Sequence, residues 1–211
     1  MRVADFTGHD SIRAMAEAVL SGAPPRFALA GLSMGGYVAQ EIMRLAPERV
    51  SRLALLDTSA RTDGEDYLSR RRGLLELARK GKFKGVTPAL LPMLIHPSRL
   101  DDRALIEAIT AMAARVGQPA FVCQQTAIIG RLDGRADLAN IACPTLILCG
   151  REDSLTPLDG HVEMAEAIPG ADPVVPGPCG PPSTMARPDA VTAARRGGAG
   201  RGRGPPATPP P

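Results

Sequence analysis

The stretch that decides the fold is RFALAGLSMGGYVAQEIMRLAPERVSRLALLD, residues 26–57. Its centre reads Gly-Leu-Ser-Met-Gly, so Ser33 stands in a G-x-S-x-G pattern. An apolar run at 27–30 leads into this pattern, a helical pattern at 36–45 follows it, and a second apolar run occupies 53–56. The order predicts a buried strand, a tight turn carrying the serine, a helix and another buried strand.

Outward from this stretch, the same alternation continues. Residues 3–6 and 145–149 are further short apolar runs bounded by turn residues, and we expect strands there. Residues 11–20 have a helical pattern that begins with a capping serine and stops at a Gly before two prolines. Strands that alternate with helices predict the α/β fold class with a mostly parallel sheet.

Residues 61–140 interrupt the alternation, because they contain no convincing strand and read as three or four amphipathic helices in succession. We expect this helical insertion to form a cap over one end of the sheet. The predicted organisation is therefore a first core segment, a helical cap, a second core segment and a tail, at residues 1–60, 61–140, 141–194 and 195–211.

Composition narrows the class of protein. The chain has 211 residues, of which 44% are hydrophobic and 22% charged, so it can bury a sizeable core. No run is long enough to predict a membrane span or a secretory signal, and we expect a cytoplasmic protein without membrane partners. The four cysteines show neither a C-x-x-C pair nor the spacing of metal ligands. Nothing in the sequence suggests a metal or an organic cofactor.

The tail at 195–211 contains four arginines and no acidic residue, and consists almost entirely of Arg, Gly and Pro. Such a composition cannot bury enough apolar surface to fold, so we expect disorder. An alternative is an arm that binds nucleic acid. The absence of aromatic residues from the tail and the slightly acidic body of the chain argue against a nucleic-acid partner.

The serine pattern has a chemical meaning in this context. Glycines at 31 and 35 remove side chains that would clash in a tight strand-to-helix turn, and Gly36 adds another small residue. Such a turn exposes the Ser33 hydroxyl above the sheet, and the backbone N–H of Met34 can then donate to a developing oxyanion. The alternative is an ordinary serine that caps the helix.

Two segments, GLSMGGYVAQEIMRLAPERVSRLALLDTSA and CPTLILCGREDSLTP, resemble the α/β-hydrolase family, in particular its small bacterial esterases and enol-lactonases. The resemblance runs from about residue 1 to about 194. It implies a hydrolase of ester, lactone or related carbonyl substrates, with Ser33 as nucleophile and Asp153 as the triad acid. For Asp153 the alternative is a turn residue on the surface.

The base that the resemblance implies is missing. The family's histidine follows the last strand, and when GPCGPPSTMARPDAV is aligned on its Cys-Gly and Ser-Thr-Met matches, that position is Pro181. The chain has three histidines, His9, His96 and His161. Each could serve as the base or be a solvated or capping residue, and without a base a serine hydroxyl is a poor nucleophile.

The front of the chain also departs from the family pattern, which has four strands before the elbow. By resemblance the run at 3–6 is the fourth of these. The missing strands would include the neighbour of the elbow strand and the second oxyanion donor. The strand at 27–30 is then an exposed apolar edge unless the run at 3–6 slips sideways to pair with it, and an open edge favours self-association. The alternative to a working hydrolase is therefore a non-catalytic, truncated remnant that lacks the triad histidine and part of the oxyanion hole.

Overall fold

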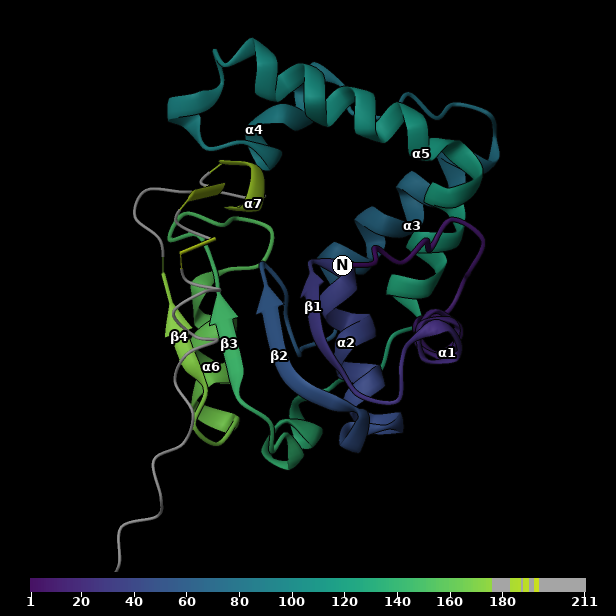
Figure 1. The fold of residues 1–211 in the computed structure, drawn as a ribbon. Helices are drawn as coiled ribbons and strands as arrows, with labels where there is room; N and C mark the ends of the chain where they lie inside the picture. The colour runs from purple at the N-terminus through teal and green to yellow at the C-terminus, as the bar shows by residue number, and fades with distance from the viewer. Residues whose placement is uncertain (176–182, 187, 190–191, 194–211) are drawn as a thin grey trace, which may run out of the picture.

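The protein is described by a computed structural model that covers residues 1–175, 183–186, 188–189 and 192–193. Its centre is a four-stranded, entirely parallel sheet in the order β1-β2-β3-β4 (Figure 1). The strands are β1 (Phe27–Leu32), β2 (Val50–Leu56), β3 (Thr145–Leu148) and β4 (Asp172–Val174). This arrangement confirms the predicted α/β class with a parallel sheet.

Helices connect and cover the strands. The α-helices are α1 (Ile12–Gly22), α2 (Met34–Leu45), α3 (Glu65–Arg79), α4 (Leu91–Leu94), α5 (Arg103–Ile129), α6 (Leu158–Ala167) and α7 (Ser183–Ala186). Short 3-10 helices are η1 (Pro47–Arg49), η2 (Pro88–Leu90), η3 (Pro97–Arg99) and η4 (Arg135–Asn140). The helix α1 begins as predicted, because the Ser11 side chain accepts a hydrogen bond from the backbone N–H of Ala14.

The main core lies between the sheet and helices α1 and α2. Leu29 of β1 is in register with Leu53 of β2, which is in turn in register with Thr145 of β3. Met15 of α1 and Ile42 of α2 are fully buried in the same apolar cluster as Leu53. The apolar runs therefore form strands because the helices on either side of them in the sequence bury them.

One predicted strand is wrong. Residues 3–6 form no strand, and residues 1–5 are exposed. The Asp5 side chain accepts a hydrogen bond from the Thr7 backbone N–H at 2.8 Å, a local turn that competes with pairing in a sheet. As a result β1 pairs with β2 alone among the described strands, and its other edge is open.

The helical insertion lies above the carboxyl ends of the strands, where α3, α4 and α5 are grouped at the top of the molecule (Figure 1). Two of the predicted helical patterns form one long helix, α5, which is broken at Gly117 by a backbone φ of 75° and is followed there by Pro119. A small apolar cluster of Ile95, Leu105 and Ile109 packs the segment around α4 against the first half of α5.

Among the described helices, none combines the length and apolar character required to cross a bilayer. Pro181 and the Arg/Gly/Pro tail at 195–211 lie outside the described residues.

Candidate active site

Ser33 occupies a strained turn between β1 and α2. Its backbone has φ 50° and ψ −117°, a conformation that residues with a side chain rarely adopt. The Ser33 N–H donates to the Leu56 carbonyl at 2.9 Å, which continues the β1–β2 ladder, and its own carbonyl accepts from the Gly36 N–H at 2.8 Å. The side chain is exposed and makes no capping hydrogen bond, so Ser33 is not an ordinary capping serine.

Two close approaches enforce this turn. A Cβ at Gly31 would lie 2.3 Å from the Gly35 carbonyl oxygen, and a Cβ at Gly36 would lie 2.3 Å from the Thr58 hydroxyl oxygen. A Cβ at Gly35 would touch nothing within 4 Å, so Gly35 itself is not required to lack a side chain for steric reasons. The predicted steric requirement for glycine is confirmed at position 31. Of the two later glycines, Gly36 has this requirement and Gly35, for which it was predicted, does not.

Met34 is the first residue of α2. The first N–H groups of a helix have no acceptor within the helix, and the helix dipole favours negative charge beside them. The backbone N–H of Met34 is therefore suitable for an oxyanion formed at Ser33.

Asp153 lies in the loop between β3 and α6 and is 4% exposed, so it is not a surface turn residue. Its Oδ1 accepts from the backbone N–H groups of Leu155 and Thr156, both at 2.8 Å. Its Oδ2 accepts from the Thr156 hydroxyl at 2.9 Å. The carboxylate is thus held rigidly by its own loop.

A second buried carboxylate, Asp57, was not among the predicted site residues. It directly follows β2, is 3% exposed and has a positive φ of 43°. Ser33 and Asp57 are the two described non-glycine residues with positive φ, and they follow Leu32 and Leu56, which are paired in register. The sequence signal that could have found it is an acidic residue at the carboxyl end of a buried strand, next to the elbow strand.

The environment of Asp57 is unusual for a carboxylate. Its Oδ2 accepts a hydrogen bond from the Ser183 backbone N–H at 2.7 Å, whereas its Oδ1 is buried without a hydrogen-bond partner. Burial raises the pKa of Asp57 from its ordinary 3.8 to about 6, although the hydrogen bond from the Ser183 backbone N–H acts in the opposite direction. The nearby charge of Asp153 raises it further.

His161 is a buried structural residue. Its Nε2 accepts from the Thr58 backbone N–H at 3.0 Å, and its Nδ1 lies 3.2 Å from the Pro157 carbonyl oxygen, to which it donates. Burial lowers the pKa of His161 below 6.5, so the neutral ring is favoured. Because both ring nitrogens are used, this ring has no lone pair to offer Ser33.

The other two histidines are His96, which caps a short helix, and His9, whose side chain makes no hydrogen bond through Nδ1. His96 caps η3, since its Nδ1 accepts from the Ser98 backbone N–H at 3.2 Å, as the capping alternative predicted. His9 is half-buried, and its Nδ1 is enclosed without a hydrogen-bond partner. None of the three is joined to Ser33 by a hydrogen bond among the described residues, and the family position for the base, Pro181, lies outside them.

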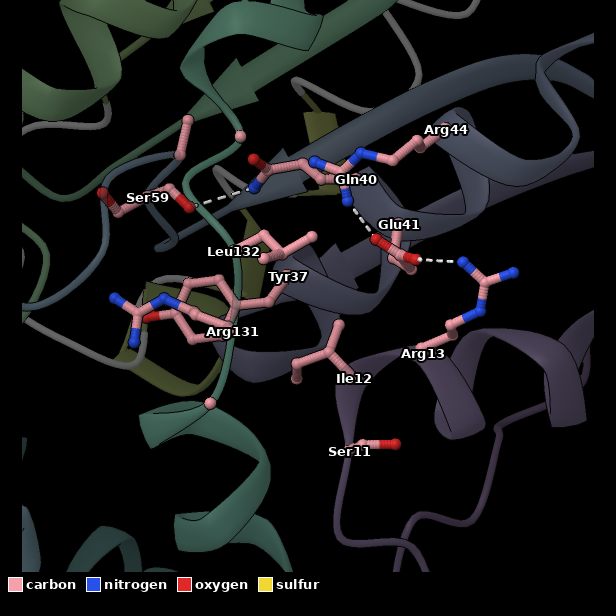
Figure 2. Close-up of a pocket in the computed structure, with 13 residues that line it drawn as sticks. Ser11, Ile12, Arg13, Tyr37, Gln40, Glu41, Arg44, Ser59, Arg131 and Leu132 are labelled. Carbon is pink, nitrogen blue, oxygen red and sulfur yellow. Dashed lines mark hydrogen bonds and ion pairs between the residues drawn. The ribbon is translucent and has the colours of Figure 1, made fainter.

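A cavity of about 140 Å³ lies on the far side of α2 from the sheet, and it contains neither Ser33 nor Asp153. Its lining includes Tyr37, Gln40 and Glu41 of α2 and Arg131, and Figure 2 shows the Tyr37 ring beside Arg131, away from Glu41. The Gln40 side chain donates to the Ser59 carbonyl at 3.0 Å. Glu41 is paired with Arg44, so the charges here already have partners.

Arg131 joins the two ends of the helical insertion beside this cavity. It donates to the Arg61 carbonyl at 2.9 Å and to the Asp63 carboxylate at 2.8 Å, just before α3 begins. Its guanidinium carbon lies 4.3 Å from the centre of the Tyr37 ring. The cavity wall is therefore a structural junction between the cap helices and α2.

Together, a parallel sheet, a strained serine turn at the start of a helix and a buried aspartate after a later strand define the α/β-hydrolase class. Residues 2–194 match the alpha/beta hydrolase family, so the chain belongs to that family. Among the described residues, no group of three or more His, Cys, Asp or Glu side chains is arranged to hold a metal ion.

Individual relatives agree with this assignment. The chain is 30% identical over 149 residues to a RutD protein of Azorhizobium caulinodans, named as a carbamate hydrolase, covering 68% of this chain and 54% of that protein. It is 28% identical over 180 residues to the pimeloyl-[acyl-carrier protein] methyl ester esterase of Photobacterium profundum, covering 76% and 65%. The chain thus spans less than two thirds of the length of both relatives.

A solved structure is similar over most of the chain. The thermophilic esterase from Thermogutta terrifontis superposes with a TM-score of 0.81 at 31% identity, covering 90% of this chain and 72% of the esterase chain. These relatives are named as hydrolases or esterases.

Proposed function

We propose that the protein is a serine hydrolase that acts on an ester, a lactone or a related carbonyl compound. The observation that carries this proposal is the turn at Ser33, whose strained backbone exposes the hydroxyl at the start of α2. Strain of this kind persists only where the surrounding structure over-determines it, and here Gly31 and Gly36 admit the close contacts that do so.

In the proposed reaction, the Ser33 hydroxyl oxygen attacks the substrate carbonyl carbon, and the carbonyl π electrons move to its oxygen. The Met34 N–H stabilises this oxyanion, which then collapses and expels the alcohol or the opened end of a lactone. Water releases the acyl group from Ser33. Asp153 orients and stabilises the base that takes the serine proton, gives it to the leaving oxygen, and then takes a proton from the attacking water.

A competing hypothesis is a non-catalytic remnant, and the histidines favour it. His161 uses both ring nitrogens within the fold, and His96 caps η3. Loss of the base from such a site typically costs several powers of ten in rate.

A fluorophosphonate probe, which reacts with activated serines, separates the two hypotheses. The hydrolase proposal expects labelling of the natural chain that Ser33→Ala abolishes. It also expects Pro181→His to raise the labelling rate by about 10²-fold or more, since it places an imidazole at the family position. Equal labelling of Ser33→Ala, or no labelling of either the natural chain or Pro181→His, would favour the remnant.

We also propose that the open edge of β1 supports self-association with a second copy of the chain. Ala28 and Ala30 are exposed along this strand, and Leu32 is 37% exposed. Ala28→Lys should reduce association, measured by sedimentation across a range of concentrations. The same profile for the natural chain and for Ala28→Lys would exclude this edge.

A further inference from the structure

The outer part of the helical insertion, residues 86–116, has an apolar cluster of its own. Every described member of this cluster except Met185 lies between positions 86 and 109. The second half of α5 packs elsewhere, since Ala127 and Ile128 belong to the main core beside the sheet. The helix α5 is thus shared by two packing units, and we call residues 86–116 the lid.

A glycine with a left-handed backbone stands at each boundary of the lid. Gly85 has φ 64°, and Gly117, where α5 is broken, has φ 75°. An added Cβ would meet nothing within 4 Å at Gly85, and at Gly117 it would meet the Pro119 Cδ at 3.9 Å. Glycine is therefore favoured here by backbone conformation and not by crowding. Such positions can absorb the φ and ψ changes of a hinge.

The chain just outside both glycines is held together at one place. Phe83, before the first glycine, and Phe121, after the second, pack with ring centroids 5.0 Å apart. The Gln118 side chain donates to the Ala78 carbonyl at the end of α3, at 2.6 Å. In Figure 1 the second part of α5 descends beside α3, whereas α4 and the first part of α5 extend across the top of the molecule. The two connections to the lid therefore leave the fixed part side by side, as a single hinge axis requires.

The lid meets the carboxyl side of the sheet through Met185 of α7, which lies below α4 in Figure 1. The helix α7 is tied to the sheet, because the Ser183 N–H donates to Asp57 Oδ2 at 2.7 Å, directly after β2. A further contact to the lid, from Arg70 of α3 to Met93 Sγ at 2.8 Å, is exposed, and a thioether is a weak acceptor. Among the described residues, one side chain from outside the lid thus completes its apolar cluster.

We propose that residues 86–116 open as one unit about Gly85 and Gly117, and that Met185 is the latch that holds this lid closed. Opening breaks the contact with Met185 but leaves the lid's own cluster intact, so it costs less than global unfolding. Because the lid lies over the carboxyl ends of the strands, where β1 leads into Ser33, opening widens the approach to the serine hydroxyl. This last consequence rests on the proposed hydrolase function, whereas the motion itself does not.

Distances between pairs of spin labels test the motion in the full chain. The labels are attached to a ketone-bearing amino acid placed at exposed positions, so the native cysteines stay unmodified. A pair at Glu48 and Glu107 joins the core to the lid. Replacing the lid position by Ser69 gives a pair that joins the core to α3, and a pair at Ala89 and Glu107 lies within the lid.

The latch is tested by Met185→Ala. It should raise the longer-distance population of the core-to-lid pair about tenfold and leave the other two distributions unchanged. An unchanged core-to-lid pair would overturn the latch. A broadened distribution for the pair within the lid would overturn motion as one unit.

The hinge is tested by Gly117→Ala. A residue with a side chain disfavours φ 75°, so alanine should favour the open conformation that relaxes it and raise the longer-distance population about fivefold. Gly73→Ala is the matched control, because Gly73 lies inside α3 without a positive φ and its Cβ would meet nothing within 4 Å. Equal distributions in these two variants would overturn the hinge at Gly117.

Access to Ser33 is tested with two fluorophosphonates of different size. Met185→Ala should raise the labelling rate of a bulky probe about tenfold and that of a small probe by less than about twofold. An equal ratio of the two rates in the natural chain and in Met185→Ala would overturn the role of the lid in access. If neither probe labels either chain, the hydrolase proposal fails, and the spin-label distances still decide whether the lid opens.

Discussion

The nucleophile side and the acid side of the candidate site are held in different ways. Around Ser33 the chain is shaped by backbone packing between residues that are close in sequence, with Gly31 against the Gly35 carbonyl. On the acid side, Asp153 is held by its own loop, but beside it hydrogen bonds to side chains join residues far apart, from Thr58 to His161 and from Ser183 to Asp57. The first arrangement tolerates no added atom at Gly31 or Gly36, whereas the second depends on charge and on the protonation state of its members.

The largest expected loss of stability comes from a substitution in the turn at Ser33. Gly31→Ala places a Cβ at 2.3 Å from a carbonyl oxygen and 2.5 Å from its carbon, both in the backbone, so the turn must open. We expect a loss of about 3 kcal/mol or more in the free energy of unfolding, measured by urea denaturation.

Gly35→Ala is the matched control for this effect. Its Cβ would meet nothing within 4 Å, and residue 35 is inside α2, where alanine is favoured over glycine by about 1 kcal/mol. The control should therefore be neutral or stabilising. Equal losses in both variants would mean that the close approach at Gly31 does not shape the turn.

The acid side should respond to pH instead. Because the pKa of Asp57 rises from 3.8 to about 6 on folding, the folded chain binds more protons than the unfolded chain within that window. Stability therefore falls as pH rises from about 4 to about 6, by about 3 kcal/mol for this group. An Asn at position 57 does not titrate, so the Asp57→Asn variant does not lose this stability. The free energy of unfolding of the variant minus that of the natural chain should therefore increase by that amount between pH 4 and pH 7.

Urea denaturation of both chains at several pH values measures this difference. All other titrating groups are shared by the two chains, so their contributions cancel to first order. A difference in unfolding free energy that stays flat across this range would show that Asp57 titrates normally.

His161 should give a smaller effect of opposite sign with pH. His161→Leu leaves the Thr58 N–H buried without an acceptor, which we expect to cost about 2 kcal/mol at pH 7. In the natural chain the lowered pKa of His161 makes protonation oppose folding, so stability is lost as pH falls through 6.5. The deficit of His161→Leu should therefore shrink at pH 5.

His161→Gln, which can still offer an acceptor oxygen, should be less destabilised than His161→Leu in thermal unfolding at pH 7. If the two variants unfold alike, the hydrogen bond from Thr58 contributes nothing measurable.

The same contrast explains what the sequence could predict. The Ser33 turn depends on residues 31–36 and on the flanking strands, so its pattern is visible in one short stretch. The parallel sheet followed from apolar runs for the same reason. By contrast, residues 3–6 have the apolar pattern of a strand, but in the structure Asp5 makes a local turn and the segment does not pair with β1. Asp57 was missed because its partner, Ser183, is 126 residues away.

The smallest expected effect on stability concerns the hydrogen bond from the Thr156 hydroxyl to Asp153. Thr156→Val removes the hydroxyl that donates to Asp153 Oδ2 at 2.9 Å but keeps both backbone donors to Oδ1. We expect a loss of about 1 kcal/mol in unfolding free energy, whereas Thr156→Ser should retain most of the stability because it keeps the hydroxyl. Since the backbone donors still hold the carboxylate, fluorophosphonate labelling of Ser33 in a Pro181→His background should be little changed by Thr156→Val. A large loss of labelling with little loss of stability would instead show that the Thr156 hydroxyl sets the orientation of Asp153 toward the base.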